Sequence, residues 1–211
     1  MNETNIKRPD WFFYPGWILA NILAITLSWF AYFLVIGVVT RWIGHTIQVN
    51  GQTRITEDYL FYYIFLPMLG LLSGILQYIL LRLYVPKMGG WILATMAGWL
   101  LVFAVMGLLT RVFEEPFLLL WNGVLAFAAI GGLIGLSQWV FLRRRIPKAG
   151  WWILASMLGW GLAVLGRLTP MRNGSAMAQL LTTILLPAIV ASFAWWYLLR
   201  PKAQLENSLS G

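Results

Sequence analysis

Cysteine is absent from this 211-residue chain, and histidine occurs only once, at His45. The lack of cysteine excludes disulfides, thiolate metal sites, iron–sulfur clusters and thiol catalysis, and a single histidine excludes a haem held by two imidazoles. Charge is scarce as well, because Asp, Glu, Lys and Arg make up only 10% of the residues. A soluble domain typically carries about 25%, so this composition excludes a water-soluble domain.

Ionisable side chains are also missing from the middle of every long apolar run. Proton and sodium pumps usually depend on such a group inside the bilayer, and serine chemistry depends on a nearby base. We therefore predict that the protein is not an enzyme, has no catalytic, cofactor-binding or metal-binding residues, and needs no cofactor. The formal net charge of +8 is interpreted as charge that anchors loops at a membrane face, and not as a nucleic-acid site.

What the chain does contain is six long apolar runs, and a bilayer core needs about 20 apolar helical residues. Their nearly all-round hydrophobicity predicts helices that face lipid and one another, so we expect an all-α membrane protein with six transmembrane helices. Residues 1–211 are treated as a single integral membrane domain. The runs are Trp11–Thr40, Asp58–Tyr84, Gly89–Leu109, Pro116–Leu142, Gly150–Leu165 and Ala176–Leu199.

An internal repeat organises these runs. Gln77–Trp99 and Gln138–Trp160 align without a gap, 61 positions apart. Shorter matches extend the repeat to the first and last runs, where Gly16–Ala20 resembles the start of the third run and Trp196–Arg200 resembles the end of the fourth. The sequence therefore predicts three tandem parallel helical hairpins, about 11–84, 85–146 and 147–203, packed with pseudo-threefold symmetry.

The loop charges predict the orientation. If the N-terminus, the second and fourth loops and the C-terminus share one side, that side carries ten basic residues and the other carries five. Cytoplasmic loops are the ones enriched in lysine and arginine, so both termini are predicted to be cytoplasmic. Seven tryptophans near that side are interpreted as an aromatic belt at the headgroups: Trp17, Trp91, Trp139, Trp151, Trp152, Trp195 and Trp196.

Candidate contact residues within the membrane are the repeated glutamines, Gln77 and Gln138. Each follows a pair of small residues four apart, Gly70/Gly74 and Gly131/Gly135, which favours close helix packing between repeats. A buried amide needs partners, and we expect an interhelical hydrogen bond, with hydroxyls on the following helix as partners. The alternative is an amide that contacts a substrate, a pigment or a lipid headgroup. The expected hydroxyl partners are Thr95 and Ser156, and the third copy has Trp195 at the glutamine position.

A second candidate set lies on the opposite side, where Arg41, Arg111 and Arg167 each close an odd-numbered run. Arginine at a helix C-terminus and carboxylates at a helix N-terminus both suit the helix dipole. We expect these arginines to pair with neighbouring acids, and the alternative is a ring of arginines that attracts an anion. The acids are Glu57, Asp58, Glu114 and Glu115.

The segment from Gly131 to Trp160 reads Gly-x-x-x-Gly-x-x-Gln-Trp, then Leu-Arg-Arg, then Ala-Gly-Trp-Trp-Ile-Leu-Ala-Ser and Gly-Trp. It resembles a motif of uncharacterised multi-pass bacterial membrane proteins that are common in photosynthetic lineages. The resemblance implies a polytopic helical fold in the bacterial cell inner membrane, or in the thylakoid, and implies no activity.

The functional hypothesis is a non-enzymatic membrane protein that binds membrane lipid and other membrane-protein subunits, as an accessory or assembly subunit. The alternative is a small-solute or lipid transporter with a cavity on the pseudo-symmetry axis. A packed axis would favour the first hypothesis, and a central cavity with a polar lining would favour the second.

Overall fold

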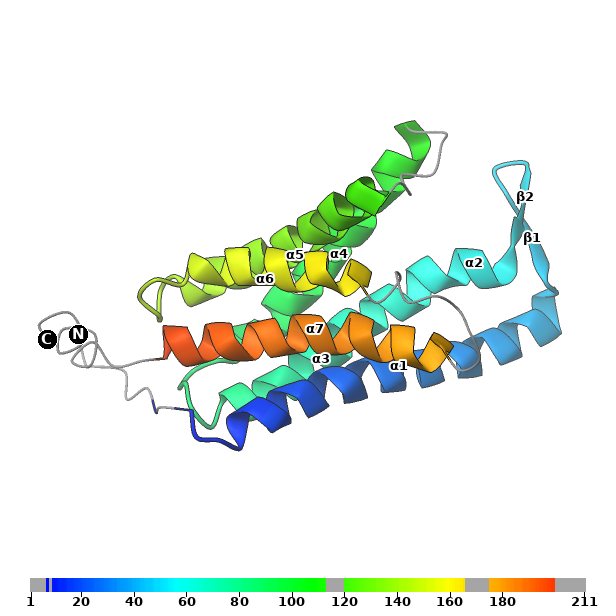
Figure 1. Cartoon of the computed structure of the whole chain (residues 1–211). Coiled ribbons are helices and arrows are strands. Elements are labelled where there is room, and N and C mark those ends of the chain that lie inside the picture. The colour runs from blue at the N-terminus through cyan, green and yellow to red at the C-terminus, as the bar shows by residue number, and fades with distance from the viewer. Residues whose placement is uncertain (1–6, 8, 113–119, 166–174, 200–211) are drawn as a thin grey trace, which may run out of the picture.

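The computed structural model describes residue 7 and residues 9–112, 120–165 and 175–199, and these ranges are almost entirely helical. The all-α prediction is correct for the main body, and Figure 1 shows one small β-hairpin beside it. The long helices are α1 (Phe13–Ile43), α3 (Leu66–Leu81), α4 (Gly90–Val112), α5 (Leu120–Leu142), α6 (Trp151–Ala163) and α7 (Ser175–Leu198).

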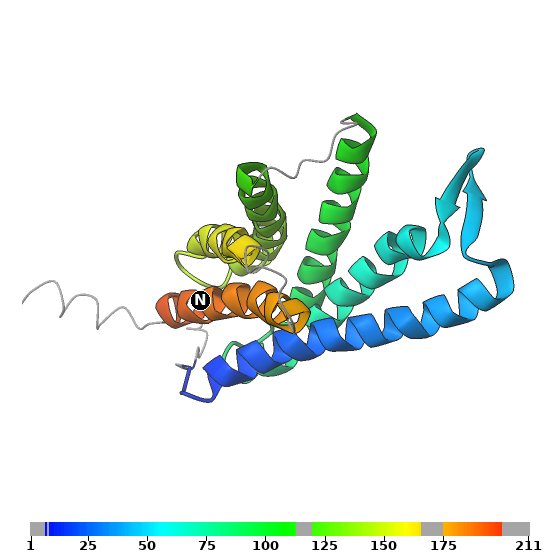
Figure 2. The ribbon, with the colours of Figure 1, turned by 45° about the vertical axis from the view of Figure 1, so that its right-hand side comes forward.

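The long helices pack in a closed circle, because each one contacts the next along the chain and α7 contacts α1. The start of α1, the end of α7 and the α3–α4 and α5–α6 turns lie at one end of the bundle, here called the terminal end (Figure 1). The β-hairpin lies at the other end, here called the hairpin end. Figure 2 shows α1 and α4 diverging toward the hairpin end.

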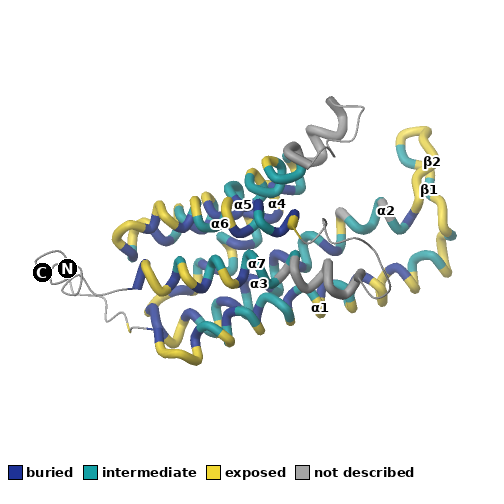
Figure 3. The backbone as a smooth tube through the Cα atoms, in the orientation of Figure 1, coloured by how far each residue is buried: buried dark blue, intermediate teal, exposed yellow. Residues whose placement is uncertain are grey.

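Three of the described helices are long and apolar enough to cross a membrane: Phe13–Ile43, Tyr63–Leu81 and Gly123–Leu142. Over the described ranges, three further apolar helices are shorter, namely Gly90–Val105, Trp151–Ala163 and Leu185–Leu198. These helices are compatible with insertion into a membrane, as the composition predicts. Large apolar side chains on α1 are exposed, among them Phe30 at 62% and Phe33 at 60%. Figure 3 shows exposed residues recurring along this helix.

Small residues set the spacing between neighbouring helices. A Cβ added at Gly74 on α3 would lie 3.0 Å from the Cα of Ile92 on α4. At the equivalent place, a Cβ added at Gly135 on α5 would lie 3.1 Å from the Cα of Ile153 on α6. Side chains at these two positions would push the helix backbones apart. The interpretation of the glycine pairs as internal packing sites is therefore confirmed.

The two turns at the terminal end share one backbone conformation. Lys87 and Lys148 occupy the left-handed region, with φ angles of 59° and 63°. Each lysine follows a proline, at Pro86 and Pro147, and each turn leads into the next helix within a few residues. A lysine with positive φ is uncommon, so its recurrence at both positions shows that the sequence repeat extends to the backbone.

The β-hairpin lies between the first two apolar runs, in a segment for which no strand is predicted from the sequence. β1 (Thr46–Val49) pairs with β2 (Gln52–Ile55) in an antiparallel arrangement. Asn50 and Gly51 both have positive φ, at 50° and 77°, as a two-residue hairpin turn requires. The Asn50-Gly51 pair is a sequence signal for such a turn. The flanking strands are only four residues long, too short to be recognised in a chain dominated by long apolar runs.

The second apolar run begins with α2 (Thr56–Leu60) and continues through a π-helical turn, η1 (Phe61–Phe65), into α3. Pro67, in the first turn of α3, has no backbone N–H, and its ring disfavours regular α-helix in the turn before it. A single wider turn accommodates this conflict without ending the helix.

Candidate functional site

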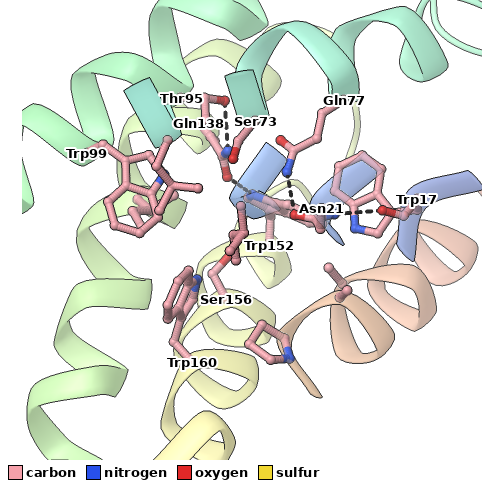
Figure 4. Close-up of a pocket in the computed structure, with 16 residues that line it drawn as sticks. Trp17, Asn21, Ser73, Gln77, Thr95, Trp99, Gln138, Trp152, Ser156 and Trp160 are labelled. Atoms are coloured by element: carbon pink, nitrogen blue, oxygen red, sulfur yellow. Dashed lines mark hydrogen bonds between the residues drawn. The ribbon is translucent and has the colours of Figure 1, made fainter. Parts of the chain in front are cut away.

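A cavity of about 70 Å³ lies at the centre of the bundle and is lined by residues of all six long helices. Figure 4 shows polar side chains gathered in the middle of it and tryptophan rings on either side. The lining residues are Trp17, Asn21, Ile25, Leu69, Ser73, Gln77, Thr95, Trp99, Ile134, Gln138, Trp152, Ser156, Trp160, Pro187, Ala188 and Ala191.

Gln77 joins three helices. Its Oε1 accepts a hydrogen bond of 3.0 Å from the indole Nε1 of Trp91 on α4, and its Nε2 donates one of 3.0 Å to Oδ1 of Asn21 on α1. An indole nitrogen can only donate, so the amide oxygen has to face Trp91 and the amide nitrogen has to face Asn21. Gln77 is 7% exposed, and these two bonds satisfy both ends of the amide.

Gln138 repeats this arrangement one hairpin later. Its Oε1 accepts a hydrogen bond of 2.7 Å from the indole of Trp152 on α6, and its Nε2 donates one of 3.0 Å to the Thr95 hydroxyl on α4. We call each set an indole clasp: a glutamine that accepts from the tryptophan of the following helix and donates to a polar residue of the preceding helix. Both sequence-predicted glutamines therefore lie in the central polar layer, where they connect helices.

The sequence predicted the partners of these glutamines only in part. Thr95 and Ser156 were expected to bond the glutamine of the helix before them. Thr95 instead accepts from Gln138, and Gln77 donates to Asn21. On the following helix, each glutamine faces an indole, that of Trp91 or Trp152, and not a hydroxyl. A signal for this was present, because Asn21, Thr95 and Ser156 each follow a tryptophan by four residues, one helical turn.

The third position of the sequence repeat is different, because α7 has Trp195 where α3 and α5 have glutamine. The Nε1 atoms of Trp17 and Trp195 are both buried, and neither has a hydrogen-bond partner among the described residues. The two ring centres lie 5.7 Å apart in an edge-on arrangement. An indole offers no oxygen to accept from its neighbour, so the third clasp is not formed at the α1–α7 contact.

Four of the tryptophans interpreted as an aromatic belt are instead core residues. Trp17, Trp91, Trp152 and Trp195 are 0–3% exposed and pack together, with ring centres 4.8 to 6.4 Å apart. This correction follows from the repeat, which brings Trp17, Trp91 and Trp152 to the same central place. Trp195 joins them from the position that glutamine occupies on α3 and α5. Trp151 is 55% exposed and Trp196 is 36% exposed, so these two remain candidates for a belt.

A second tryptophan pair lines the cavity on the other side of the polar layer. Trp99 and Trp160 meet edge to face with ring centres 5.4 Å apart. Figure 4 shows these two rings on the opposite side of Gln138 and Asn21 from Trp17. The polar layer is therefore bounded by aromatic rings on both sides.

The outer arginines are only partly described. Arg41 is exposed in the last turn of α1, whereas the side chain of Arg111 and all of Arg167 lie outside the described residues. The same holds for Glu114, Glu115 and the Asp58 side chain. Glu57 pairs with His45, at 2.6 Å between Nδ1 and Oε1, and this hydrogen bond lowers the pKa of the Glu57 carboxyl below its usual value.

At the terminal end, the N-terminal segment is fixed to the α3–α4 turn. The Tyr84 hydroxyl donates a hydrogen bond of 2.7 Å to Oδ1 of Asp10. Burial, together with this bond and the carboxylate charge, raises the pKa of Tyr84 to about 12. Cationic side chains cover aromatic rings nearby, with the Arg145 guanidinium 3.9 Å from the Phe141 ring centre.

An apolar groove of about 440 Å³ runs along the outer side of the α1–α7 contact. Ser192 is among its lining residues, and its hydroxyl donates to the carbonyl of Ala188 in its own helix, at 2.8 Å. Phe193 is 68% exposed beside it. The groove is lined by Tyr14, Ile18, Ile189, Ser192, Phe193 and Trp196.

Within the described ranges, no group of three histidine, cysteine, aspartate or glutamate side chains is arranged to hold a metal ion. The chain matches no protein-family model, and no curated protein and no solved structure is significantly similar to it.

Proposed function

We propose that this protein is a non-enzymatic integral membrane protein that acts as an accessory or assembly subunit, binding membrane lipid and other membrane proteins through its outer surface. The proposal rests mainly on the interior of the bundle, where the central amide side chains are already hydrogen-bonded. Both central glutamines are held in indole clasps, and aromatic rings bound the polar layer on both sides. A cavity of about 70 Å³ is less than half the size of an apolar protein cavity that holds benzene, about 150 Å³, so it leaves no room for an organic substrate of that size or larger.

The outer surface, in contrast, offers room for a partner. The groove between α1 and α7 has about 440 Å³ and an almost wholly apolar lining. Its residues lie at the α1–α7 contact, where Trp195 takes the glutamine position and no indole clasp forms. A partner helix or a lipid chain that fills this groove would bury Phe193 and Trp196, and large aromatic side chains are typical anchors of protein interfaces.

The proposed architecture is six membrane spans in three tandem hairpins with pseudo-threefold symmetry. Its support is the recurrence of equivalent contacts, namely the two indole clasps, the two left-handed lysines and the two glycine contacts. The circular order of helix contacts is the order that three consecutive hairpins around an axis would have.

The proposed orientation places both termini in the cytoplasm of a bacterial cell inner membrane or a thylakoid. It is supported by exposed basic residues at the terminal end, including Lys7, Arg82, Lys87, Arg144 and Lys148. These two bacterial membranes are proposed only because of the sequence resemblance.

The subunit proposal is tested by Phe193→Glu, with Leu125→Glu on α5 as the matched control. Both residues are large, apolar and exposed, at 68% and 67%, but only Phe193 lines the groove. We expect the wild type extracted in mild detergent to migrate as part of a larger assembly, which Phe193→Glu dissociates and Leu125→Glu leaves intact. Identical migration of the wild type and both variants as single chains would overturn the proposal.

A second candidate is the transporter hypothesis, which is favoured by the polar lining that the helices give to the central cavity. The size of the cavity limits such a function to solutes smaller than benzene, water and ammonia among them. Swelling of proteoliposomes in stopped-flow light scattering tests it, with Gln138→Leu as the variant. A wild-type rate equal to that of empty liposomes removes this candidate.

A further inference from the structure

We propose that the α3–α4 and α5–α6 turns are two equivalent binding sites for the phosphate group of anionic phospholipids, centred on Lys87 and Lys148. Both turns lie at the terminal end of the bundle (Figure 1). This inference rests on the lipid-binding part of the proposed function, and it names the class of lipid and the place of contact.

The backbone of each turn holds its lysine in a conformation that lysine seldom adopts. Lys87 and Lys148 have φ angles of 59° and 63°, where the Cβ atom is crowded by the backbone. Glycine adopts this conformation without that penalty. Each turn does contain a glycine two positions later, but Gly89 and Gly150 do not have positive φ. Lysine therefore stands twice at the position that favours glycine, and we attribute this to a function of its side chain.

The contacts of the two lysines within the protein do not account for their charge. Both side chains are exposed, and no carboxylate of the described ranges lies within ion-pair distance of either ammonium group. The Lys148 ammonium lies 5.5 Å from the centre of the Tyr197 ring, a contact that uses none of its three N–H donors for a hydrogen bond to an oxygen. The lysines are thus available to an anion from outside the chain.

Other cations surround each lysine. An exposed arginine, Arg82 or Arg143, lies five positions before it, so the same pair of cations recurs in both turns. The Arg143 guanidinium lies 5.1 Å from the centre of the Trp139 ring, which restricts where this cation can point. Among the described residues at this end the acid is Asp10, which already accepts hydrogen bonds from Tyr84 and from a backbone N–H. Each turn therefore presents the clustered positive charge that binds phosphate.

Exposed apolar side chains beside these cations favour a lipid over a soluble anion. Leu83 is 58% exposed next to Arg82, and Trp151 is 55% exposed three positions after Lys148. Trp11, just before α1, is 68% exposed at the same end. Cations interleaved with apolar and aromatic side chains are typical of a surface at headgroup level, where the cations meet phosphates and the apolar groups enter the acyl boundary. In the proposed orientation this surface faces the cytoplasmic leaflet, which carries negative charge.

The test is thermal unfolding of the protein in micelles of a neutral detergent that contain increasing amounts of phosphatidylglycerol or phosphatidylcholine. We expect the melting temperature to rise and saturate with phosphatidylglycerol and to change little with phosphatidylcholine, because the two lipids differ in headgroup charge. Inorganic phosphate at the same concentrations should have no comparable effect, since it has no chains to hold it in the micelle. Native mass spectrometry should show one tightly bound phosphatidylglycerol molecule for each of the two turns.

The double variant Lys87→Gly/Lys148→Gly removes both cations and relaxes the backbone at the same time. Without anionic lipid we expect its melting temperature to equal or exceed that of the wild type. We expect its half-saturating concentration of phosphatidylglycerol to be about fivefold higher, as for the loss of one cation from each site. Lys87→Arg/Lys148→Arg keeps the charge and should respond as the wild type does.

Arg41→Gln/Arg54→Gln is the matched control, because it removes the same charge from exposed residues at the hairpin end. We expect it to leave the response to phosphatidylglycerol unchanged. A control that weakens the response as much as the glycine variant would show an effect of net charge alone and would overturn the proposal.

Equal stabilisation by phosphatidylglycerol and phosphatidylcholine, or by inorganic phosphate, would also overturn it. So would a glycine variant that is less stable than the wild type in neutral detergent but responds normally to phosphatidylglycerol, since the lysines would then have a structural role. Each of these failures leaves the subunit proposal standing, because that proposal is judged by the migration of Phe193→Glu.

Discussion

The rings of Trp17 and Trp195 meet edge-on with their centres 5.7 Å apart, and both indole N–H groups lack an acceptor in the described chain. In the two other hairpins the same place holds a glutamine, whose oxygen accepts the bond from the following tryptophan. The presence of tryptophan instead of glutamine at position 195 thus explains why two indole N–H groups have no acceptor.

Replacing Trp195 with glutamine should supply the missing acceptor. The introduced amide oxygen would face the Trp17 indole, and its nitrogen would face Ser156, as in the other two clasps. Trp195→Leu removes the same ring without adding an acceptor. We expect Trp195→Gln to be more stable than Trp195→Leu by about 1 kcal/mol, the reverse of the usual order in an apolar core. Unfolding in mixed micelles measures the difference, and a more stable leucine variant would contradict the clasp pattern.

Trp152→Phe should lose more stability than Trp17→Phe, although the two substitutions remove the same atoms. Trp152→Phe leaves Oε1 of Gln138 buried without its donor, which costs about 1–3 kcal/mol. Trp17→Phe removes a donor that has no acceptor, so only the loss of ring contacts remains. Thermal unfolding of both variants in the same detergent checks the order, and equal losses of stability would show that the Trp152 bond contributes nothing.

Gly131→Ala tests the close approach of α5 and α6. The added methyl group would overlap the backbone carbonyl of Ser156, so the helices would have to separate, which costs about 1–3 kcal/mol. Gly37→Ala on α1 is the control, since no atom lies within 4 Å of its added Cβ. For Gly37→Ala we expect no loss of stability, or a gain of up to about 1 kcal/mol from helix propensity. The larger substitutions Gly74→Leu and Gly135→Leu should also destabilise the bundle.

Tyr84→Phe tests how firmly the N-terminal segment is held. It removes the bond to Asp10, and we expect a loss of about 1 kcal/mol at neutral pH. The folded-state pKa of Tyr84, about 12, lies above the usual value of 10.0. The advantage of the wild type over Tyr84→Phe should therefore be constant below pH 10 and disappear as the pH rises through 12. An advantage that does not change over this interval would contradict the assigned bond.

Cysteine labelling tests the proposed orientation without background, because the chain has no native cysteine. Gln52→Cys lies in the exposed β-hairpin, and Arg144→Cys lies in the exposed α5–α6 turn at the terminal end. An impermeant maleimide should label Gln52→Cys in intact cells and label Arg144→Cys only after permeabilisation. The opposite pattern would place the termini outside the cytoplasm.

The sequence predicted much of the helical framework, because the repeat and the apolar runs depend on local features. Gln77 and Gln138 were singled out since an amide in an apolar run needs partners. Their partners could not be identified in the same way. The repeat shows that Asn21 and Thr95 occupy equivalent places, but it does not show which neighbouring helix faces them. That choice is made only when the helices pack.

The burial of Trp17 and Trp195 was missed for a related reason. A tryptophan near the end of an apolar run has the same sequence signature whether it faces headgroups or the bundle axis. Helix rotation decides between these places, and close packing at positions such as Gly74 and Gly135 restricts that rotation. The β-hairpin was missed because its strands are only four residues long.

The unclosed third clasp has an evolutionary consequence. In an assembly of identical single-hairpin chains, every substitution appears in every copy, so one of three equivalent places cannot change alone. With all the hairpins on one chain, Trp195 can replace glutamine while Gln77 and Gln138 persist. Joining the proposed hairpins in one gene therefore permits an asymmetry that separate copies could not encode, and it distinguishes α7, which has no clasp to either neighbour, from α3 and α5.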